Sequence, residues 1–142
     1  MRDGTPAHWQ RRCAVSGPES FLSRWSCRFA CAGRGLVHVL TKEPSGRVHA
    51  AVLPVVAGLG IWLQIGASGW AILALAAGGV LAAEALNTAV ERLADRVSEE
   101  REEAIRLVKD LAAGGVLAAT LGAVLAGLAV LGPPLWTRLA GW

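Results

Sequence analysis

The chain has 142 residues, 54% of them hydrophobic, and a mean hydropathy of +0.45. This composition is too apolar for a soluble domain of that size and indicates one all-α domain integral to a membrane. The net charge of +3 does not call for a nucleic-acid partner, because membrane topology explains where the basic residues lie. Eight of the fourteen precede residue 48 and five lie between residues 92 and 109, so the positive-inside rule places both regions in the cytoplasm.

The first 19 residues mix Arg, Gly, Pro and Ser without an apolar period, which predicts a flexible tail and no signal peptide. The three cysteines, Cys13, Cys27 and Cys31, all lie in the expected cytoplasmic part, where thiols stay reduced, so no disulfide is expected. Cys27, Cys31 and His38 lack the second Cys/His pair of a four-ligand metal site and are interpreted as ordinary helix residues.

Residues 20–41 separate into an apolar and a basic side at helical spacing. The apolar side is formed by Phe21, Leu22, Trp25, Phe29, Ala32, Leu36, Val39 and Leu40. The other side carries Arg24, Arg28, Arg34, His38 and Lys42. This pattern predicts an amphipathic helix on the inner membrane surface, with a basic side that meets either lipid headgroups or a polyanionic substrate.

A break in the helical pattern follows at residues 41–47. Pro44 disfavours helix at Glu43, and Gly46 loosens the next turn. The chain is therefore expected to enter the membrane here, with Glu43 held at the cytoplasmic interface. Taken alone, Glu43 could equally pair with Lys42 or Arg47 in water.

A long apolar stretch runs from Val48 to Ala83, with His49 as its only ionisable residue. Roughly 35 residues at about 1.5 Å each exceed a single span of about 20, so the stretch must fold back. Gly and Ser at residues 64–69, between Trp62 and Trp70, predict an external corner without Lys or Arg. The first two spans are therefore expected at about residues 48–64 and 70–95.

The charged residues 98–106 predict a cytoplasmic turn of mostly solvated side chains. A third apolar span is expected at about residues 109–131, ended by Pro133-Pro134, with residues 136–142 as a short tail. Three spans place the N-terminus inside and the C-terminus outside. The resulting architecture is a membrane-embedded three-helix bundle within a domain of residues 20–135.

Three carboxylates and an amide form one stripe on the second span. Glu84, Asn87, Glu91 and Asp95 fall within roughly 80° on a helix of about 100° per residue. A carboxylate at membrane depth costs about 2.5–3.5 kcal/mol on insertion scales, so an acid such as Glu84 is not there for packing. Glu91 and Asp95 stand four apart, which favours a cation nearby.

The cytoplasmic ends of the spans are expected to bring this stripe together with Glu43, Lys109 and Asp110. Such carboxylates suit a divalent cation such as Mg²⁺, which usually carries phosphate oxygens as well. A deeper carboxylate could accept the proton of a hydroxyl presented from the bilayer. No Walker A, kinase glycine loop or HExxH sequence is present. The residues alone indicate a metal–phosphate site at a membrane surface, with a proton or ion pathway as the competing interpretation.

Two motifs in this region resemble those of the small prokaryotic diacylglycerol kinase family, which includes undecaprenol kinases. They are Glu84-x-x-Asn87-Thr88-Ala89-Val90-Glu91-x-x-x-Asp95 and Lys109-Asp110-Leu-Ala-Ala-Gly-Gly-Val116. Upstream, Phe29-Ala-Cys-Ala-Gly33-Arg34-Gly35-Leu36 and Glu43-Pro-Ser-Gly-Arg47-Val48-His49 look like the family's surface helix and acidic turn. The resemblance covers roughly residues 24–131.

The resemblance implies a role for each matching residue. Glu84 is expected to be the general base, and Glu43 and Glu91 are expected to hold a divalent metal, Mg²⁺ or another, that bridges the phosphates of ATP. ATP binding would involve Arg24, Glu43, Glu91, Lys109 and Asp110, while Asn87 and Asp95 orient the site. The resemblance also implies a homotrimer in the bacterial inner membrane. Cys31, Pro44-Ser45-Gly46 and Glu102 depart from the common family pattern, mainly on the nucleotide side.

The sequence thus predicts an ATP-dependent kinase that phosphorylates diacylglycerol or an undecaprenol-type polyprenol. One alternative is a catalytically inactive homologue or small membrane-assembly protein of the same fold. Another is an ion or proton carrier that uses Glu84 and Glu91. That alternative needs a polar path through the outer halves of the spans, where only Gln64 and Ser68 appear.

Overall fold

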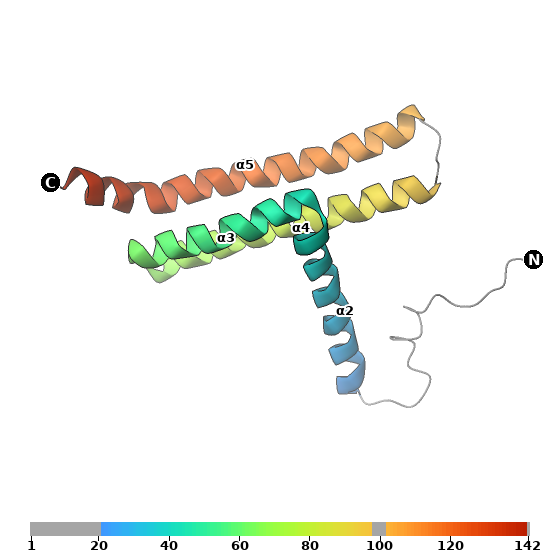
Figure 1. Cartoon of the computed structure of the whole chain (residues 1–142), viewed down its shortest axis with the longest axis horizontal. Helices are drawn as coiled ribbons and strands as arrows, with labels where there is room; N and C mark the ends of the chain where they lie inside the picture. Colours follow the sequence, from blue (N-terminus) through green and yellow to red (C-terminus); the bar gives the residue numbers. More distant parts are fainter. Residues whose placement is uncertain (1–20, 98–101, 142) are drawn as a thin grey trace, which may run out of the picture. The chain divides into compact units, whose positions relative to one another are not determined.

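The structure is a computed structural model that describes residues 21–97 and 102–141, and in this part of the chain it is entirely helical. Figure 1 shows the helices α2 (Phe21–Lys42), α3 (Pro44–Trp62), α4 (Ala67–Val97) and α5 (Glu103–Ala140). The all-α prediction is confirmed for these residues. The expected tail at residues 1–19 and residues 98–101 of the charged turn lie outside the described ranges.

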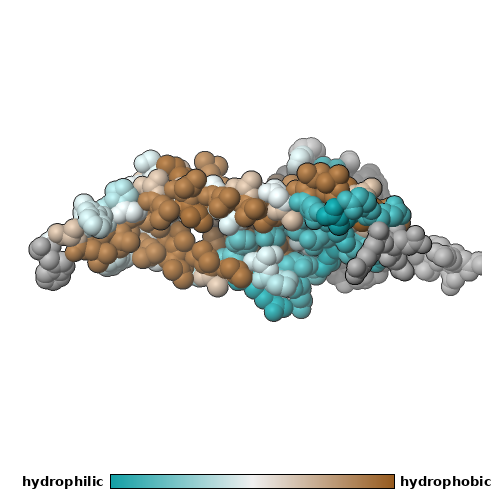
Figure 2. Space-filling model, turned by 90° about the horizontal axis from the view of Figure 1, so that it is seen from above, coloured by the Kyte–Doolittle hydropathy of each residue, from teal (hydrophilic) through white to brown (hydrophobic). Residues whose placement is uncertain are grey.

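Three of the described helices, α3, α4 and α5, are long and apolar enough to cross a membrane, as the hydropathy pattern predicts. Their large apolar side chains are mostly exposed, for example Leu75, Leu121 and Leu125. On the face seen in Figure 2, hydrophobic residues cover much of the half that holds the α3–α4 turn. Such a surface suits a surrounding of lipid, which is as apolar as these side chains.

The helix predicted for residues 20–41, where apolar and basic residues separate, is confirmed as α2. Near its start, the rings of Trp25 and Phe29 lie 6.1 Å apart, and the Arg28 guanidinium lies 5.5 Å above the Trp25 ring. Such a cation–π contact is typically worth about 0.5–1 kcal/mol at an exposed site. The position of this helix on the membrane surface stays a prediction.

Helix α3 begins at Pro44, four residues before the expected start of the first span. Proline is favoured in the first helical turn because its missing N–H has no helical partner there. Glu43 is the N-cap, with extended backbone angles of φ −83° and ψ 137°. Pro44 thus separates α2 from α3, and Glu43 lies at the N-terminus of α3.

Gly46 lies in the first turn of α3 against the last turns of α2. A Cβ atom at this position would lie 2.0 Å from the Val39 carbonyl oxygen, which is a backbone atom and cannot rotate away. The close approach therefore requires glycine. It fixes the relation between Val39 and the first turn of α3, the turn that carries Glu43 and Ser45.

We expect Gly46→Ala to destabilise the protein by about 1–3 kcal/mol, the range for forced overpacking. The measurement is thermal unfolding in detergent. Gly58→Ala is the matched control on the same helix, because an added Cβ meets nothing within 4 Å there. Equal unfolding temperatures for both variants would contradict the close approach at Gly46.

The corner between the first two spans is a short turn at Leu63–Gly66, within the expected region. Gln64 has a positive φ of 53°, which lets the chain reverse between α3 and α4. Gly60 lies against the Trp70 ring, which a Cβ on Gly60 would approach to 2.9 Å. The turn brings α3 and α4 side by side, and α4 packs more extensively against α5 (Figure 1).

Helix α5 differs from expectation at its C-terminal end. It continues through Pro133 and Pro134 to Ala140, whereas two adjacent prolines normally end a helix in water. Proline is tolerated in apolar helices where side chains and neighbouring helices satisfy the freed backbone groups. The carbonyls that lose their helical partners are those of Ala129 and Val130, four residues before each proline. Beyond the prolines, the Thr137 hydroxyl donates to the Pro134 carbonyl at 2.9 Å, and the Arg138 guanidinium lies 5.7 Å from the Trp62 ring of α3.

Candidate functional site

A carboxylate occupies the buried stripe of α4. The buried residues of this helix are Leu73, Val80, Glu84, Thr88 and Ala94. The first four of these residues follow one another at intervals of seven, four and four positions. Such intervals place them on one face of the helix, which packs against neighbours. Glu84 therefore stands where an apolar residue is expected, and only 5% of its side chain is exposed.

Two residues of α3 contact this buried carboxylate. The Ser45 hydroxyl donates to Oε2 of Glu84 at 3.1 Å, and Nε2 of His49 lies 3.4 Å from Oε1. Ser45 and His49 are four apart and so share one face of α3. Burying a carboxylate is costly unless it is hydrogen-bonded, and these contacts supply a partner for each oxygen.

Asn87 and Glu91 form the next pair along α4. Nδ2 of Asn87 donates to Oε1 of Glu91 at 2.9 Å, and Oδ1 of Asn87 is buried without a hydrogen-bond partner among the described residues. An unpartnered amide oxygen one turn from a carboxylate is an available hard ligand, of the kind that Mg²⁺ and Ca²⁺ take. The donor chemistry at this turn therefore fits a divalent cation.

The described residues contain no group of three or more His, Cys, Asp or Glu side chains arranged to hold a metal ion. Mg²⁺ is usually bound by one or two protein carboxylates, with water and phosphate oxygens in the other positions. Glu43 and Glu91, with the free oxygen of Asn87, are compatible with that smaller number of protein ligands.

Glu43 pairs with an arginine of α4. An Nη2 nitrogen of Arg92 lies 2.7 Å from Oε1 of Glu43 and 2.7 Å from Nε2 of His38. Arg92 directly follows Glu91, so this pair brings the α3 N-cap beside the turn that carries Glu91. A bond between an arginine and a carboxylate is charge-assisted, although the exposure of Arg92 reduces its contribution to stability.

Lys109 of α5 pairs with Asp95 of α4 through its ammonium group. Asp110 does not join them, because its carboxylate accepts from Arg106 one turn earlier on α5 at 2.9 Å. The pair of Asp95 and Lys109 therefore links α4 to α5 across the charged turn. Asp110 lies in this structure as an exposed acid of its own helix.

Among the described residues, two pairs of predicted site residues meet directly, Asn87 with Glu91 and Asp95 with Lys109. Glu84, Glu43 and Asp110 instead contact residues that were not predicted. Side-chain exposure rises along the stripe from 5% at Glu84 to 65% at Asp95. Arg24 falls within α2, but its side chain lies outside the described part. Sequence reasoning missed the partners Ser45, His49 and Arg92. For His49 a signal existed, since it is the only ionisable residue of the apolar stretch before Glu84.

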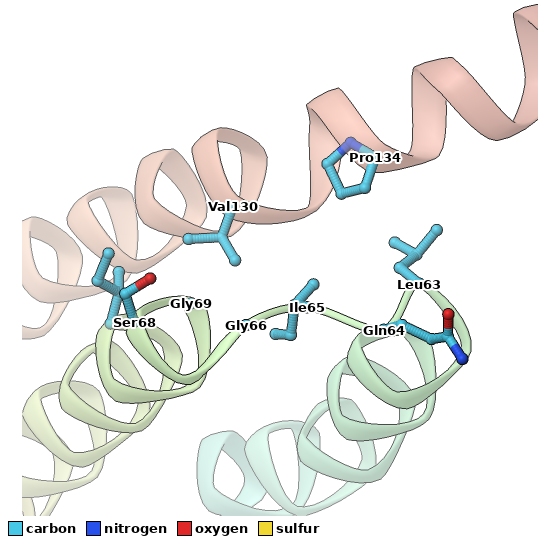
Figure 3. Close-up of a pocket in the computed structure, with 9 residues that line it drawn as sticks. Leu63, Gln64, Ile65, Gly66, Ser68, Gly69, Val130 and Pro134 are labelled. Carbon is cyan, nitrogen blue, oxygen red and sulfur yellow. The ribbon is translucent and has the colours of Figure 1, made fainter.

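A shallow pocket of about 400 Å³ lies at the other end of the helical hairpin. It is lined by the α3–α4 turn and by Val130 and Pro134 of α5; Leu63 points into it, whereas the Gln64 amide points away (Figure 3). Its lining contains no charged residue. Glu84 is 17 residues past the start of α4, or about 25 Å along a helix, so this pocket is separate from the acidic residues.

Comparison with known proteins adds independent information. The sequence model described as prokaryotic diacylglycerol kinase matches residues 30–131. An undecaprenol kinase of Bacillus subtilis is 31% identical over 114 residues, which cover 80% of this chain and 93% of the relative. A diacylglycerol kinase of Synechocystis sp. is 34% identical over 108 residues, 75% of this chain and 62% of the relative. No solved structure matches significantly.

Proposed function

This chain belongs to the prokaryotic diacylglycerol kinase family, and from that premise we propose that it transfers the γ-phosphoryl group of ATP to the hydroxyl of a membrane lipid. The acceptor is diacylglycerol or an undecaprenol-type polyprenol, the alcohols in the names of the two relatives. The family match over residues 30–131 carries this proposal. The buried acid Glu84, in a helix apolar enough to span a membrane, supports it.

Glu84 is proposed as the general base. As the lipid oxygen attacks the γ-phosphorus, Glu84 accepts the hydroxyl proton, the bond to the bridging oxygen breaks and ADP leaves. Its burial supports this role, because an acceptor lipid presents its hydroxyl at the membrane boundary. The more exposed residues of the stripe, Asn87, Glu91 and Asp95, continue from there toward water, where ATP arrives.

Glu43 and Glu91 are proposed to hold a divalent cation such as Mg²⁺, with Asn87 able to contribute its free oxygen. When bound, the cation neutralises charge on the ATP phosphates. Lys109 and Asp110 are proposed to contact ATP, with Arg24 as a further contact and Asp95 orienting Lys109. In phosphoryl transfer such groups act by positioning and by electrostatic stabilisation.

The protein is proposed to lie in the bacterial inner membrane with its N-terminus in the cytoplasm and its C-terminus outside. The basic clusters before residue 48 and at residues 92–109 support this orientation. We also propose assembly to a homotrimer, as the family resemblance implies. The exposed apolar residues of α5 are compatible with it.

The direct test is a transfer assay with purified protein in detergent, Mg²⁺ and γ-labelled ATP. Diacylglycerol and undecaprenol are offered in parallel reactions, and label is expected in at least one lipid and absent when EDTA removes the metal. Omitting lipid measures ATP hydrolysis alone. A folded protein that labels neither lipid would contradict the proposal and favour an inactive homologue.

A further inference from the structure

Two residues of α3 contact the Glu84 carboxylate, and neither is among the acidic residues proposed above as base or metal ligands. Ser45 contacts one carboxylate oxygen and His49 the other, at 3.1 and 3.4 Å. Resting on the proposed function, we propose that His49, assisted by Ser45, is a positioning residue that holds the Glu84 carboxylate in the orientation that accepts the proton of the lipid hydroxyl.

The burial of the Glu84 and His49 side chains supports this role. The side chain of His49 is 20% exposed and that of Glu84 5% exposed, so their contact lies largely out of water. Burying a carboxylate is costly unless it is hydrogen-bonded. The contacts from Ser45 and His49 therefore hold this carboxylate in place, and the direction of its oxygens depends on them.

The two contacts leave acceptor sites on the carboxylate unused. An ionised carboxylate has about four acceptor sites, and the contacts from Ser45 and His49 use one on each oxygen. One lone pair per oxygen therefore stays available to a hydroxyl. The two contacts also restrict rotation of the carboxylate, which directs the remaining lone pairs in a fixed way.

His49 rather than a nearby arginine faces the carboxylate. Arg47, two residues earlier, donates through Nε to the Thr41 carbonyl at 3.1 Å. For His49 to donate to Glu84, its proton must be on Nε2, a state that the neutral imidazole can provide. The carboxylate then gains a donor without a permanent positive charge at the membrane boundary.

The test compares His49→Leu, which removes the donor, with His49→Gln, whose amide nitrogen can reach a similar place. Val48→Leu is the control, a similar change at an exposed neighbour on α3. The first readout needs no catalysis: the apolar reagent dicyclohexylcarbodiimide modifies carboxyl groups, more slowly where neighbouring side chains hold them, and mass spectrometry measures its addition to Glu84. The second readout is lipid phosphorylation, with kcat and KM for ATP determined separately.

We expect several-fold faster labelling of Glu84 in His49→Leu and rates near wild type in the other two variants. The kcat of His49→Leu should fall about tenfold, as expected for a lost hydrogen bond to a charged group, with KM for ATP unchanged. His49→Gln should recover most of this loss. If His49 had only a structural role, His49→Gln would not restore kcat, and the loss in His49→Leu would not be confined to kcat with KM for ATP unchanged.

Unchanged labelling in a folded His49→Leu protein would overturn the proposal, and so would faster labelling with unchanged kcat. If His49→Leu does not fold, His49→Asn replaces it, because its shorter amide cannot reach Glu84 and the same labelling decides. If the wild-type protein phosphorylates neither lipid while the labelling changes as expected, the kinase proposal fails and the hold of His49 on Glu84 is supported.

Discussion

Replacing Glu84 by glutamine is expected to lower the kcat of lipid phosphorylation by about 10²–10⁴-fold, the usual contribution of a positioned general base. Glutamine keeps the size of the side chain and can still contact Ser45 and His49, but its amide cannot accept the hydroxyl proton. The protein should therefore stay folded. Steady-state transfer of label from ATP to lipid measures the effect.

The matched control for this change is Glu103→Gln. Glu103 begins α5, its side chain is 81% exposed, and it pairs with Arg106 of the same helix. This variant should keep wild-type turnover, because both side chains of the pair are largely exposed and Glu103 makes no contact with Glu84. If Glu84→Gln were as active as Glu103→Gln, Glu84 would not be the base.

Glu91→Gln is expected to raise the Mg²⁺ concentration needed for half-maximal activity by at least about tenfold, the lower end of the range for changes at metal sites. The substitution removes the negative charge that attracts the cation, while the contact with Asn87 can be kept by the new amide. Titrating Mg²⁺ at fixed ATP and lipid measures the shift.

Excess Mg²⁺ distinguishes this effect from loss of the base. It should restore much of the activity of Glu91→Gln, because the lost interaction concerns affinity for the cation, and none of the activity of Glu84→Gln. Glu103→Gln again serves as the control for loss of one acidic charge. An unchanged Mg²⁺ requirement in Glu91→Gln would remove this residue from the proposed metal ligands.

Hydropathy and helical periodicity predicted the helical elements well. The apolar stretch is too long for one span and had to fold back. The polar and glycine residues near Gln64 indicated the position of the turn, and the structure has the turn there. The path of α5 through Pro133 and Pro134 could not be predicted in the same way. Rules for proline describe helices in water, and an apolar surrounding changes the cost of the freed backbone groups.

The acidic stripe on α4 was also accessible from sequence, because residues on one helix have fixed angular relations. The pairs between helices were not. Whether Glu84 meets His49, or Glu43 meets Arg92, depends on the rotation of α3 about its axis, and helices that are apolar on most sides do not define that rotation. Asp110 illustrates the same limit, since its partner Arg106 lies on its own helix.

The unequal lengths of α3 and α4 determine where Glu84 lies along the helical hairpin. Helix α3 has 19 residues and α4 has 31, about 28 and 46 Å at 1.5 Å per residue. Because a tight turn joins them, the N-terminus of α3 is level with Glu84, and the last turns of α4 overhang α3. Helix α3 alone is about long enough to cross a bilayer core of about 30 Å. We therefore expect the last turns of α4, from Asn87 to Val97, to extend beyond the hydrocarbon, with Glu84 close to its boundary.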